Sequence, residues 1–290
     1  MAASSGDAGT AGVIQGRYQL HEELGRGSMG VVHLARDLET GAMVAVKIMA
    51  PSGGCAPDAL VEARERFLLG GEAAGRLKHP DIVTVLEAGQ DRGRAYIAME
   101  LLKGRDLAHR TRPDNLLPLP LLLSIGARVA EALAYAHRLN VVHRDIKPGN
   151  ILWDPASDSV KVTDFGIAQV ADPGTNRSGV ILGTPSYMSP EQLAAGPIDG
   201  RSDLYSLGVT LYHLACGRLP FEGGSMAELV YRIRNDPPAS ILRLRPDLPA
   251  GVVRVIYQAM MKIPEQRYRD GEEMGRALRE CAATLAGTAR

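Results

Sequence analysis

The spacing of apolar and polar residues divides the chain into a strand-rich first third and a helix-rich remainder. Short apolar or alternating runs between glycine-bearing turns predict strands, and apolar positions at helical spacing predict helices. The predicted strands are 18–24, 31–35, 43–49, 82–88, 95–99, 151–153 and 160–163, and the predicted helices are 58–77, 124–138, 201–216, 225–235, 251–262 and 271–286. This order predicts an α+β protein of two unequal lobes with a ligand-binding cleft between them, joined by a short crossing at 101–104.

Composition excludes several classes of protein. The 290 residues are 45% apolar, which is enough for a sizeable core and argues against wholesale disorder. The 33 Lys and Arg residues balance 33 Asp and Glu residues, whereas a protein that coats nucleic acid usually has a basic excess. Cys55, Cys216 and Cys281 lie far apart in the sequence, so we expect no disulfide framework and no zinc ribbon, and a reducing compartment.

Two segments bear on targeting. Residues 1–17 are rich in Ala, Gly and Ser and lack a basic residue followed by an apolar run, which predicts a flexible tail and not a signal peptide. The most apolar stretch, 116–127, is interrupted by Pro118 and Pro120 and is shorter than the roughly 20 residues that span a bilayer, so it predicts a core helix. We therefore expect a soluble, cytoplasmic protein whose single folded domain covers 18–285, without an attached sensor domain.

Three glycines stand at the turn between the first two predicted strands, in Gly25-Arg26-Gly27-Ser28-Met29-Gly30. Glycine lets a backbone approach a phosphate closely, and backbone N–H groups can bind its oxygens. A Rossmann fingerprint would need a helix here, and a Walker loop would need a following Gly-Lys-Ser/Thr, and the sequence has neither. Lys47 ends the second strand after this turn, where its ammonium group can reach the same phosphates.

The segment 143–150 carries the most specific pattern in the chain. It begins with His-Arg-Asp, has Lys147 two residues after the Asp, and ends with Asn150, between apolar residues on both sides. A solvated charged loop would not require this order, which matches the catalytic loop of protein kinases. An Asp-Phe-Gly run at 164–166 then follows the next short strand, as the same pattern requires.

On these motifs the chain resembles the eukaryotic-type (Hanks-type) serine/threonine protein kinases, most of all their bacterial branch. The resemblance covers about 18–285 and includes the runs at 183–191 and 203–208 and Arg267. In the family, residues placed like Glu191 and Arg267 form a buried ion pair. It implies a bilobal kinase fold, with a small β-rich lobe at 18–102 and a larger helical lobe at 103–285. It also implies transfer of the γ-phosphoryl group of ATP to serine or threonine hydroxyls of proteins, including a second copy of the chain. From the charge balance and the short apolar stretch we expect no nucleic-acid partner and no membrane segment.

The resemblance also implies the roles of individual residues. Asp145 would accept the proton of the attacking hydroxyl, Lys147 would hold the transferring phosphoryl group, and Lys47 would bind the phosphates of ATP. Asn150 and Asp164 would hold Mg²⁺, or Mn²⁺ in its place. The implied nucleotide contacts come from the glycine-rich turn and the strands (Leu24, Gly25, Arg26, Gly27, Ser28, Gly30, Val32, Ala45, Lys47), from the gatekeeper and hinge (Met99, Glu100, Leu102), from a ribose contact (Asp106) and from the metal-holding residues (Asn150, Asp164).

Two further features of the resemblance concern the acceptor hydroxyl and its control. Lys147 is the residue that serine/threonine kinases carry at this place, and Thr184 would line the site beside it. Arg144 precedes the catalytic aspartate and needs an anion, which implies that phosphorylation between residues 164 and 191 orders that segment. Thr175 and Ser178 are the candidate acceptors, and a plain polar loop is the equal alternative.

One position departs from the family pattern. The family places a glutamate on the small-lobe helix to pair with the strand lysine, and the corresponding residue here is Gly70. Glu72 lies about 200° further round an ideal helix and Glu65 is also misplaced, so either a distorted helix brings Glu72 to Lys47 or Lys47 lacks this partner. Two alternatives therefore stay open: a nucleotide-binding pseudokinase scaffold, and a small-molecule kinase of similar fold, which would not be expected to carry the run at 183–191.

Overall fold

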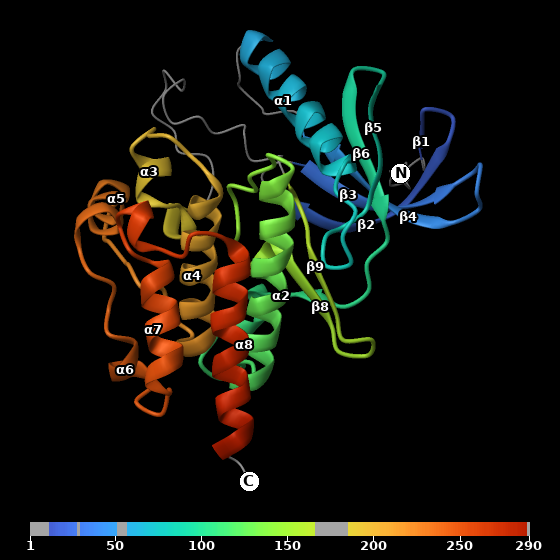
Figure 1. The fold of residues 1–290 in the computed structure, drawn as a ribbon. Helices are drawn as coiled ribbons and strands as arrows, with labels where there is room; N and C mark the ends of the chain where they lie inside the picture. The colour runs from blue at the N-terminus through green and yellow to red at the C-terminus, as the bar shows by residue number, and fades with distance from the viewer. Residues whose placement is uncertain (1–11, 28–29, 51–56, 166–184, 289–290) are drawn as a thin grey trace, which may run out of the picture.

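The computed structural model describes residues 12–27, 30–50, 57–165 and 185–288. The small lobe is a six-stranded antiparallel sheet of strand order β1-β2-β3-β4-β6-β5, with one long helix beside β5 and β6 (Figure 1). Its elements are β1 (Val13–Ile14), β2 (Tyr18–Gly27), β3 (Gly30–Asp37), β4 (Met43–Met49), α1 (Pro57–Gly75), β5 (Val85–Asp91) and β6 (Arg94–Glu100).

Alternation along β4 sorts its side chains between the two faces of the sheet. Val44, Val46 and Ile48 belong to a hydrophobic cluster on one face, together with residues of β1, β2, β3 and β6. Because successive strand residues point to opposite faces, Ala45 and Lys47 point the other way, and Ala45 packs into the main core. This alternation places Lys47 on the face of the sheet that looks toward the large lobe.

The first described residues fold as part of the small lobe. β1 pairs with β2, and Ile14 is fully buried. Arg17 ends the turn between β1 and β2 and donates two hydrogen bonds to the Asp37 carboxylate, both at 2.9 Å, which fix this turn. Residues 12–17 belong to the segment that the Gly- and Ser-rich composition led us to expect as a flexible tail. Composition does not reveal that Val13–Ile14 pairs with the edge of β2 and that Ile14 is thereby buried.

The large lobe consists mainly of helices, which lie below the small lobe in Figure 1. Its helices are α2 (Leu119–Arg138), α3 (Pro190–Leu193), α4 (Gly200–Cys216), α5 (Met226–Asn235), α6 (Ile241–Leu244), α7 (Ala250–Ala259) and α8 (Gly271–Thr288), with single 3₁₀ turns at Leu107–Arg110, Pro148–Asn150, Pro185–Tyr187 and Pro264–Gln266. A three-stranded sheet, β7-β8-β9, lies beside α2 and consists of β7 (Arg105–Asp106), β8 (Ile151–Asp154) and β9 (Ser159–Val162). The expected bilobal α+β architecture is confirmed.

Helix α2 begins five residues earlier than the apolar spacing predicts, at Leu119 in place of Ser124. Pro118 is its N-cap and Pro120 lies in its first turn, where a missing N–H costs no hydrogen bond, so the prolines start the helix and do not interrupt it. Among the described residues, α2 is the one helix whose length and composition would suit a membrane span, and 61% of that span is buried inside the protein. It is the core helix that the sequence predicts, packed against α8 and α4.

The connection between α1 and β5 is bound to the large lobe. The Val83 N–H donates to the Val162 carbonyl at 3.0 Å, and the Val162 N–H donates to the Asp81 carbonyl at 2.8 Å. Arg128 of α2 donates to the Asp81 carboxylate at 2.9 Å. Because these residues pair with β9, the strand predicted at 82–88 begins only at Val85.

Glu191 and Arg267 form the buried ion pair that the family resemblance implies. The two guanidinium NH₂ nitrogens of Arg267 donate to the two carboxylate oxygens of Glu191, both at 2.7 Å, and the Arg267 side chain is 0% exposed. Ser202 donates to the same carboxylate at 2.6 Å. Burial raises the pKa of Glu191, but the hydrogen bonds and charge of Arg267 lower it by more, so its net pKa lies below the usual value. The pair joins α3 to the segment before α8.

Helix α1 touches the sheet directly at Gly71, the second residue of its glycine pair. Gly70 and Gly71 are both buried. A Cβ atom at Gly71 would lie 2.8 Å from Cβ of Ala88 on β5 and 2.9 Å from Cδ1 of Ile97 on β6, closer than any side chain tolerates. The absence of a side chain at Gly71 therefore sets the distance between the helix and the sheet.

We predict that Arg267→Met lowers the free energy of unfolding by about 3–5 kcal/mol, because it leaves the Glu191 carboxylate buried without its partner. Chemical denaturation measures this loss. The control is Arg279→Met, which removes an exposed ion pair with Glu131 and should cost about 1 kcal/mol or less. Equal losses in the two variants would contradict the prediction.

We predict that Gly71→Ala lowers the free energy of unfolding by about 1–3 kcal/mol, because the overlap with Ala88 and Ile97 outweighs the gain in helix propensity. Gly75→Ala is the matched control on the same helix. Its Cβ would meet only Val85 Cγ1, at 4.0 Å, so the substitution should stabilise by up to about 1 kcal/mol. Urea denaturation of both variants tests the contrast, and stabilisation by both would refute it.

Candidate active site

A cleft of about 670 Å³ lies between the two lobes. The site residues predicted from the sequence line it, except Ser28 and Thr184, which lie outside the described residues: Leu24, Gly25, Arg26, Gly27, Gly30, Val32, Ala45, Lys47, Met99, Glu100, Leu102, Asp106, Asp145, Lys147, Asn150 and Asp164. The sequence did not single out the other lining residues, which are Leu101, Gly104, Arg105, His109, Gly149, Leu152 and Thr163. Most of these seven stand inside or next to a motif, and proximity to the motif is the signal that could have found them.

The glycine-rich turn is the hairpin between β2 and β3, in which Gly27 pairs with Gly30. A Cβ atom at Gly25 or Gly27 would meet no atom within 4 Å, so these two residues leave open space at the cleft. Gly30 has a different reason to be glycine. Its φ is 154°, and a Cβ atom there would overlap the Ile48 carbonyl of β4. Glycine at position 30 therefore allows β3 to lie close to β4.

Lys47 pairs with Asp164 across the cleft. Its side chain is almost fully buried, and its Nζ donates to Asp164 Oδ1 at 2.7 Å. Burial raises the pKa of Asp164, but the charge and hydrogen bond of Lys47 lower it by more, so the carboxyl is ionised at neutral pH. Glu65 and Glu72 both lie on the exposed side of α1. Among the described residues, neither glutamate takes the place of the one missing at Gly70.

The catalytic loop orients the Asp145 carboxylate with two donors. Lys147 Nζ donates to Asp145 Oδ2 at 2.6 Å, and Asn150 Nδ2 donates to the same oxygen at 3.0 Å. Asn150 also donates to the Asp145 carbonyl at 2.8 Å, which closes the loop on itself. The three side chains that the sequence places within six residues therefore form one contact group in the large-lobe wall of the cleft.

Asp203 of α4 holds the backbone that precedes Asp145. Its carboxylate is fully buried and accepts the N–H of His143 at 2.8 Å and the N–H of Arg144 at 2.7 Å. The ring of His137, at the end of α2, lies 2.8 Å from the same carboxylate. Arg144 has a φ of 68°, which is a left-handed backbone conformation. Residues other than glycine adopt it only when their surroundings enforce it.

His143 sets the spacing between the catalytic loop and the Asp-Phe-Gly run. Its Nδ1 accepts the Asp145 N–H at 3.2 Å, so its Nε2 carries the hydrogen and donates to the Thr163 carbonyl at 2.8 Å. Its ring meets the ring of Phe165 edge-on, with centroids 4.5 Å apart. The segment that carries Asp164 is thereby tied to the loop that carries Asp145.

The hinge carries a side-chain link that the sequence did not reveal. Glu100 Oε1 accepts the Thr84 N–H at 2.7 Å and the ammonium of Lys161 on β9 at 2.7 Å. Burial raises the pKa of Glu100, and these bonds lower it by more, so the carboxylate is charged. The side chain of Glu100 therefore links the hinge to both lobes.

Asp106 uses its side chain to cap the 3₁₀ turn after β7, accepting the Ala108 N–H at 2.8 Å.

Asn150 and Asp164 fit the chemistry of a magnesium site. The amide nitrogen of Asn150 donates to Asp145, which leaves its Oδ1 for a cation, and Asp164 adds an ionised carboxylate. In the part of the chain that the structure describes, no group of three or more His, Cys, Asp or Glu residues could hold a metal ion. Two hard oxygen donors suit Mg²⁺, which usually completes its coordination with phosphate oxygens and water.

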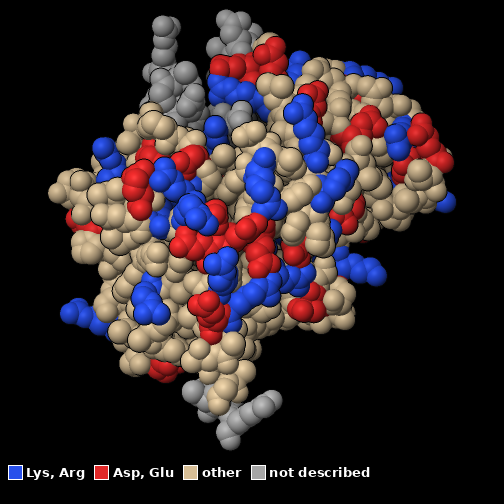
Figure 2. Space-filling view, in the orientation of Figure 1, with Lys and Arg blue, Asp and Glu red and all other residues tan. Residues whose placement is uncertain are grey.

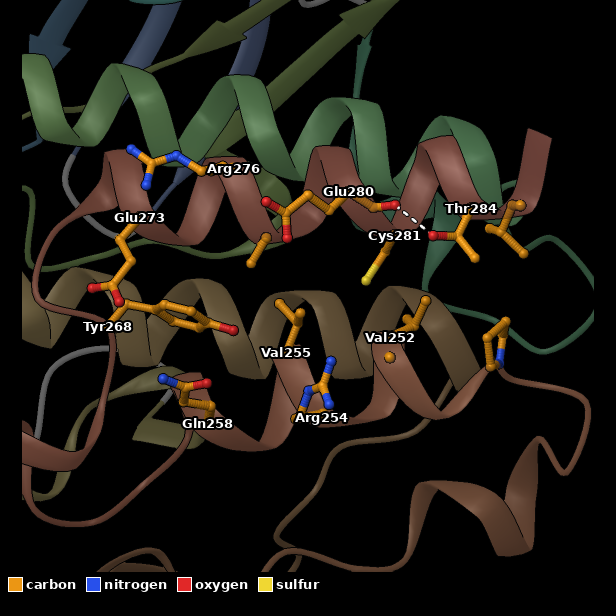
Figure 3. Close-up of a pocket in the computed structure, with 14 residues that line it drawn as sticks. Val252, Arg254, Val255, Gln258, Tyr268, Glu273, Arg276, Glu280, Cys281 and Thr284 are labelled. Atoms are coloured by element: carbon orange, nitrogen blue, oxygen red, sulfur yellow. Dashed lines mark hydrogen bonds between the residues drawn. The ribbon is translucent and has the colours of Figure 1, made fainter. Parts of the chain in front are cut away.

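A second cavity, of about 580 Å³, lies between α7 and α8 (Figure 3). Val252, Val255 and Cys281 supply apolar wall, and the Tyr268 hydroxyl points into the space between the helices. Its charged rim consists of Arg254, Glu273, Arg276 and Glu280. It contains none of the residues that the sequence predicts to be functional, so the candidate active site is the cleft between the lobes.

The face in Figure 2 carries both signs of charge without a wide patch of either. Ion pairs between α2 and α8, such as Arg279 with Glu131 at 2.6 Å, contribute to this mixture. The even balance of charges in the sequence is thus also seen locally on this face. Nothing on it resembles the basic stripe typical of a nucleic-acid-binding surface.

Comparison with known proteins agrees with the geometry. The chain is 37% identical to serine/threonine-protein kinase pkn3 of Myxococcus xanthus, 37% identical to PknJ of Mycobacterium tuberculosis and 36% identical to PrkC of Bacillus subtilis. These matches cover 88%, 97% and 90% of this chain but only 48%, 47% and 40% of the relatives, so the chain spans less than half their length.

A solved structure, that of Rad53 residues 1–466 in complex with AMP-PNP, has the same fold. The TM-score is 0.73 at 24% sequence identity, and the match covers 90% of this chain and 64% of that one. The protein kinase domain model matches residues 18–269, which include every motif of the cleft. The chain therefore belongs to the protein kinase domain family.

Proposed function

We propose that the chain transfers the γ-phosphoryl group of ATP to serine or threonine hydroxyls of protein substrates. The observation that carries this proposal is the Asp145 carboxylate, oriented by Lys147 and Asn150 in the cleft that also contains Lys47 and Asp164. A base, a phosphate-binding cation and the oxygen ligands for a metal thus lie in one cavity. Phosphoryl transfer requires little beyond such positioning and charge stabilisation.

In the proposed reaction, the substrate hydroxyl oxygen attacks the γ-phosphorus, the bond to the β–γ bridging oxygen breaks, and ADP leaves. Asp145 accepts the hydroxyl proton as the new O–P bond forms. Lys147, already 2.6 Å from Asp145, neutralises charge on the transferring group, and Lys47 binds the phosphates on the small-lobe side. Mg²⁺ held by Asn150 and Asp164 would neutralise phosphate charge during the transfer.

The choice of serine and threonine rests on the relatives and on one residue. The bacterial relatives are named serine/threonine-protein kinases, and Lys147 occupies the place that marks this class. Thr184, the other expected mark, lies outside the described residues. A pseudokinase scaffold is the second candidate, because none of the described glutamates of α1 pairs with Lys47. The Asp145 contact group is not required of a scaffold, which makes catalysis the better supported function.

We predict that Asp145→Asn lowers transfer from labelled Mg-ATP to a generic basic protein by about 100-fold or more, because the general base is lost. Phosphoamino-acid analysis of the wild-type product should give phosphoserine and phosphothreonine. Asp114→Asn, a substitution at an exposed aspartate, is the matched control and should retain full activity. Nucleotide binding without transfer by the wild type would favour the scaffold.

We also predict that the wild-type protein incubated with Mg-ATP gains phosphate on the peptide that contains residues 172–178. The candidate acceptors Thr175 and Ser178 lie outside the described residues, so this expectation rests on Arg144. The Nε of Arg144 is buried without a hydrogen-bond partner among the described residues, as expected for an arginine that awaits an anion. Mass spectrometry that finds this peptide unmodified while a generic substrate is phosphorylated would contradict the prediction.

A further inference from the structure

The peptide groups around Arg144 are held from two sides. On one side the Arg144 N–H is bound by Asp203 at 2.7 Å. On the other side the Arg144 carbonyl, which begins the peptide bond to Asp145, accepts a hydrogen bond from Gln192 Nε2 at 2.9 Å. A left-handed residue other than glycine is strained and persists only where its surroundings hold it in place. Gln192 and Asp203 therefore together keep Arg144, the residue before the catalytic aspartate, in this conformation.

Gln192 uses both ends of its side-chain amide. It lies at the third position of α3, where its Oε1 accepts the Ser189 N–H at 2.9 Å. Ser189 Oγ accepts the Gln192 N–H in return, at 3.3 Å, which completes a capping box. Gln192 is 7% exposed, so solvent would not replace a lost partner easily. A capping box needs only the oxygen of this side chain, and the bond to Arg144 is additional.

The segment that carries Gln192 is itself anchored to rigid parts of the large lobe. The hydroxyl oxygen of Tyr187 lies 2.7 Å from Nδ1 of His213 on α4. Burial raises the pKa of Tyr187 to about 12 and lowers that of His213, so the hydroxyl donates to a neutral ring. Glu191, next to Gln192, is fixed by Arg267. The segment 185–193 is thus a fixed support from which Gln192 reaches the catalytic loop.

We propose that Gln192 is a positioning residue for the catalytic aspartate: its amide N–H holds the Arg144 carbonyl and so aims Asp145 into the cleft. This role rests on the proposed phosphoryl transfer. Gln192 is not among the described residues that line the cleft, so in this proposal it acts through the peptide group between Arg144 and Asp145. It joins the segment 185–193 to the residue that accepts the substrate proton.

The two hydrogen-bonding ends of Gln192 can be separated by substitution. Gln192→Glu keeps an oxygen acceptor for the Ser189 N–H but replaces the donor to Arg144 with a second acceptor. Ser189→Ala removes the bond from the Gln192 N–H but keeps the side-chain bond to Arg144. We expect Gln192→Glu to lower kcat about tenfold, with the KM for ATP and the affinity for nucleotide unchanged, because one buried carbonyl loses its partner and faces a carboxylate. Ser189→Ala should keep kcat within about twofold of the wild type while lowering the melting temperature.

Steady-state kinetics of purified wild type, Gln192→Glu and Ser189→Ala tests the proposal, with nucleotide titration and thermal melting as checks on folding. Should Gln192→Glu melt below the assay temperature, Gln192→Met, which is apolar and of similar shape, replaces it with the same expected loss of kcat. A kcat equal to wild type in the position-192 variant, or the same loss in Ser189→Ala, would overturn the proposal. A wild type without transfer activity would instead refute the proposed function.

Discussion

The active site depends on the hydrogen bonds that the buried carboxylate of Asp203 accepts from the catalytic loop. This carboxylate accepts the N–H groups of His143 and Arg144 and lies against the ring of His137, and these contacts compensate for burying a charge without solvent. Asp203 is in the first turn of α4, most of whose residues are buried. The catalytic loop has little regular structure of its own, so this bond to the most buried helix of the large lobe gives it a fixed position.

The other side of the cleft is organised by packing more than by charge. In the family pattern an ion pair between a helix glutamate and the strand lysine holds the small-lobe helix in place. Here Gly71 brings the backbone of α1 against Ala88 and Ile97, and the position of the helix follows from close contact with the sheet. Lys47 is left to pair with Asp164, a residue that the reaction itself needs. A change in the position of α1 would therefore reach the active site through the sheet and not through a salt bridge.

The sequence predicts the parts of the protein whose signal is local. Alternation along β4 places Lys47 at the cleft, and the order of residues in 143–150 places Lys147 and Asn150 on Asp145, because a short loop cannot separate them widely. Contacts between remote segments outside the family motifs leave no such signal. The bond from Lys161 to Glu100 joins residues 61 positions apart, and that from Gln192 to Arg144 joins residues 48 apart. Only the assembled fold reveals these partners.

The bonds from His143 and Arg144 to Asp203 lie within the protein, so they should hold the catalytic loop whether or not nucleotide is bound. Amide hydrogen exchange of the nucleotide-free protein tests this most directly, because a buried N–H exchanges only when its surroundings open. We expect the N–H groups of His143 and Arg144 to exchange as slowly as buried N–H groups in the middle of α4. Exchange of these two groups as fast as that of an exposed turn, while α4 stays protected, would show that Asp203 does not hold the loop.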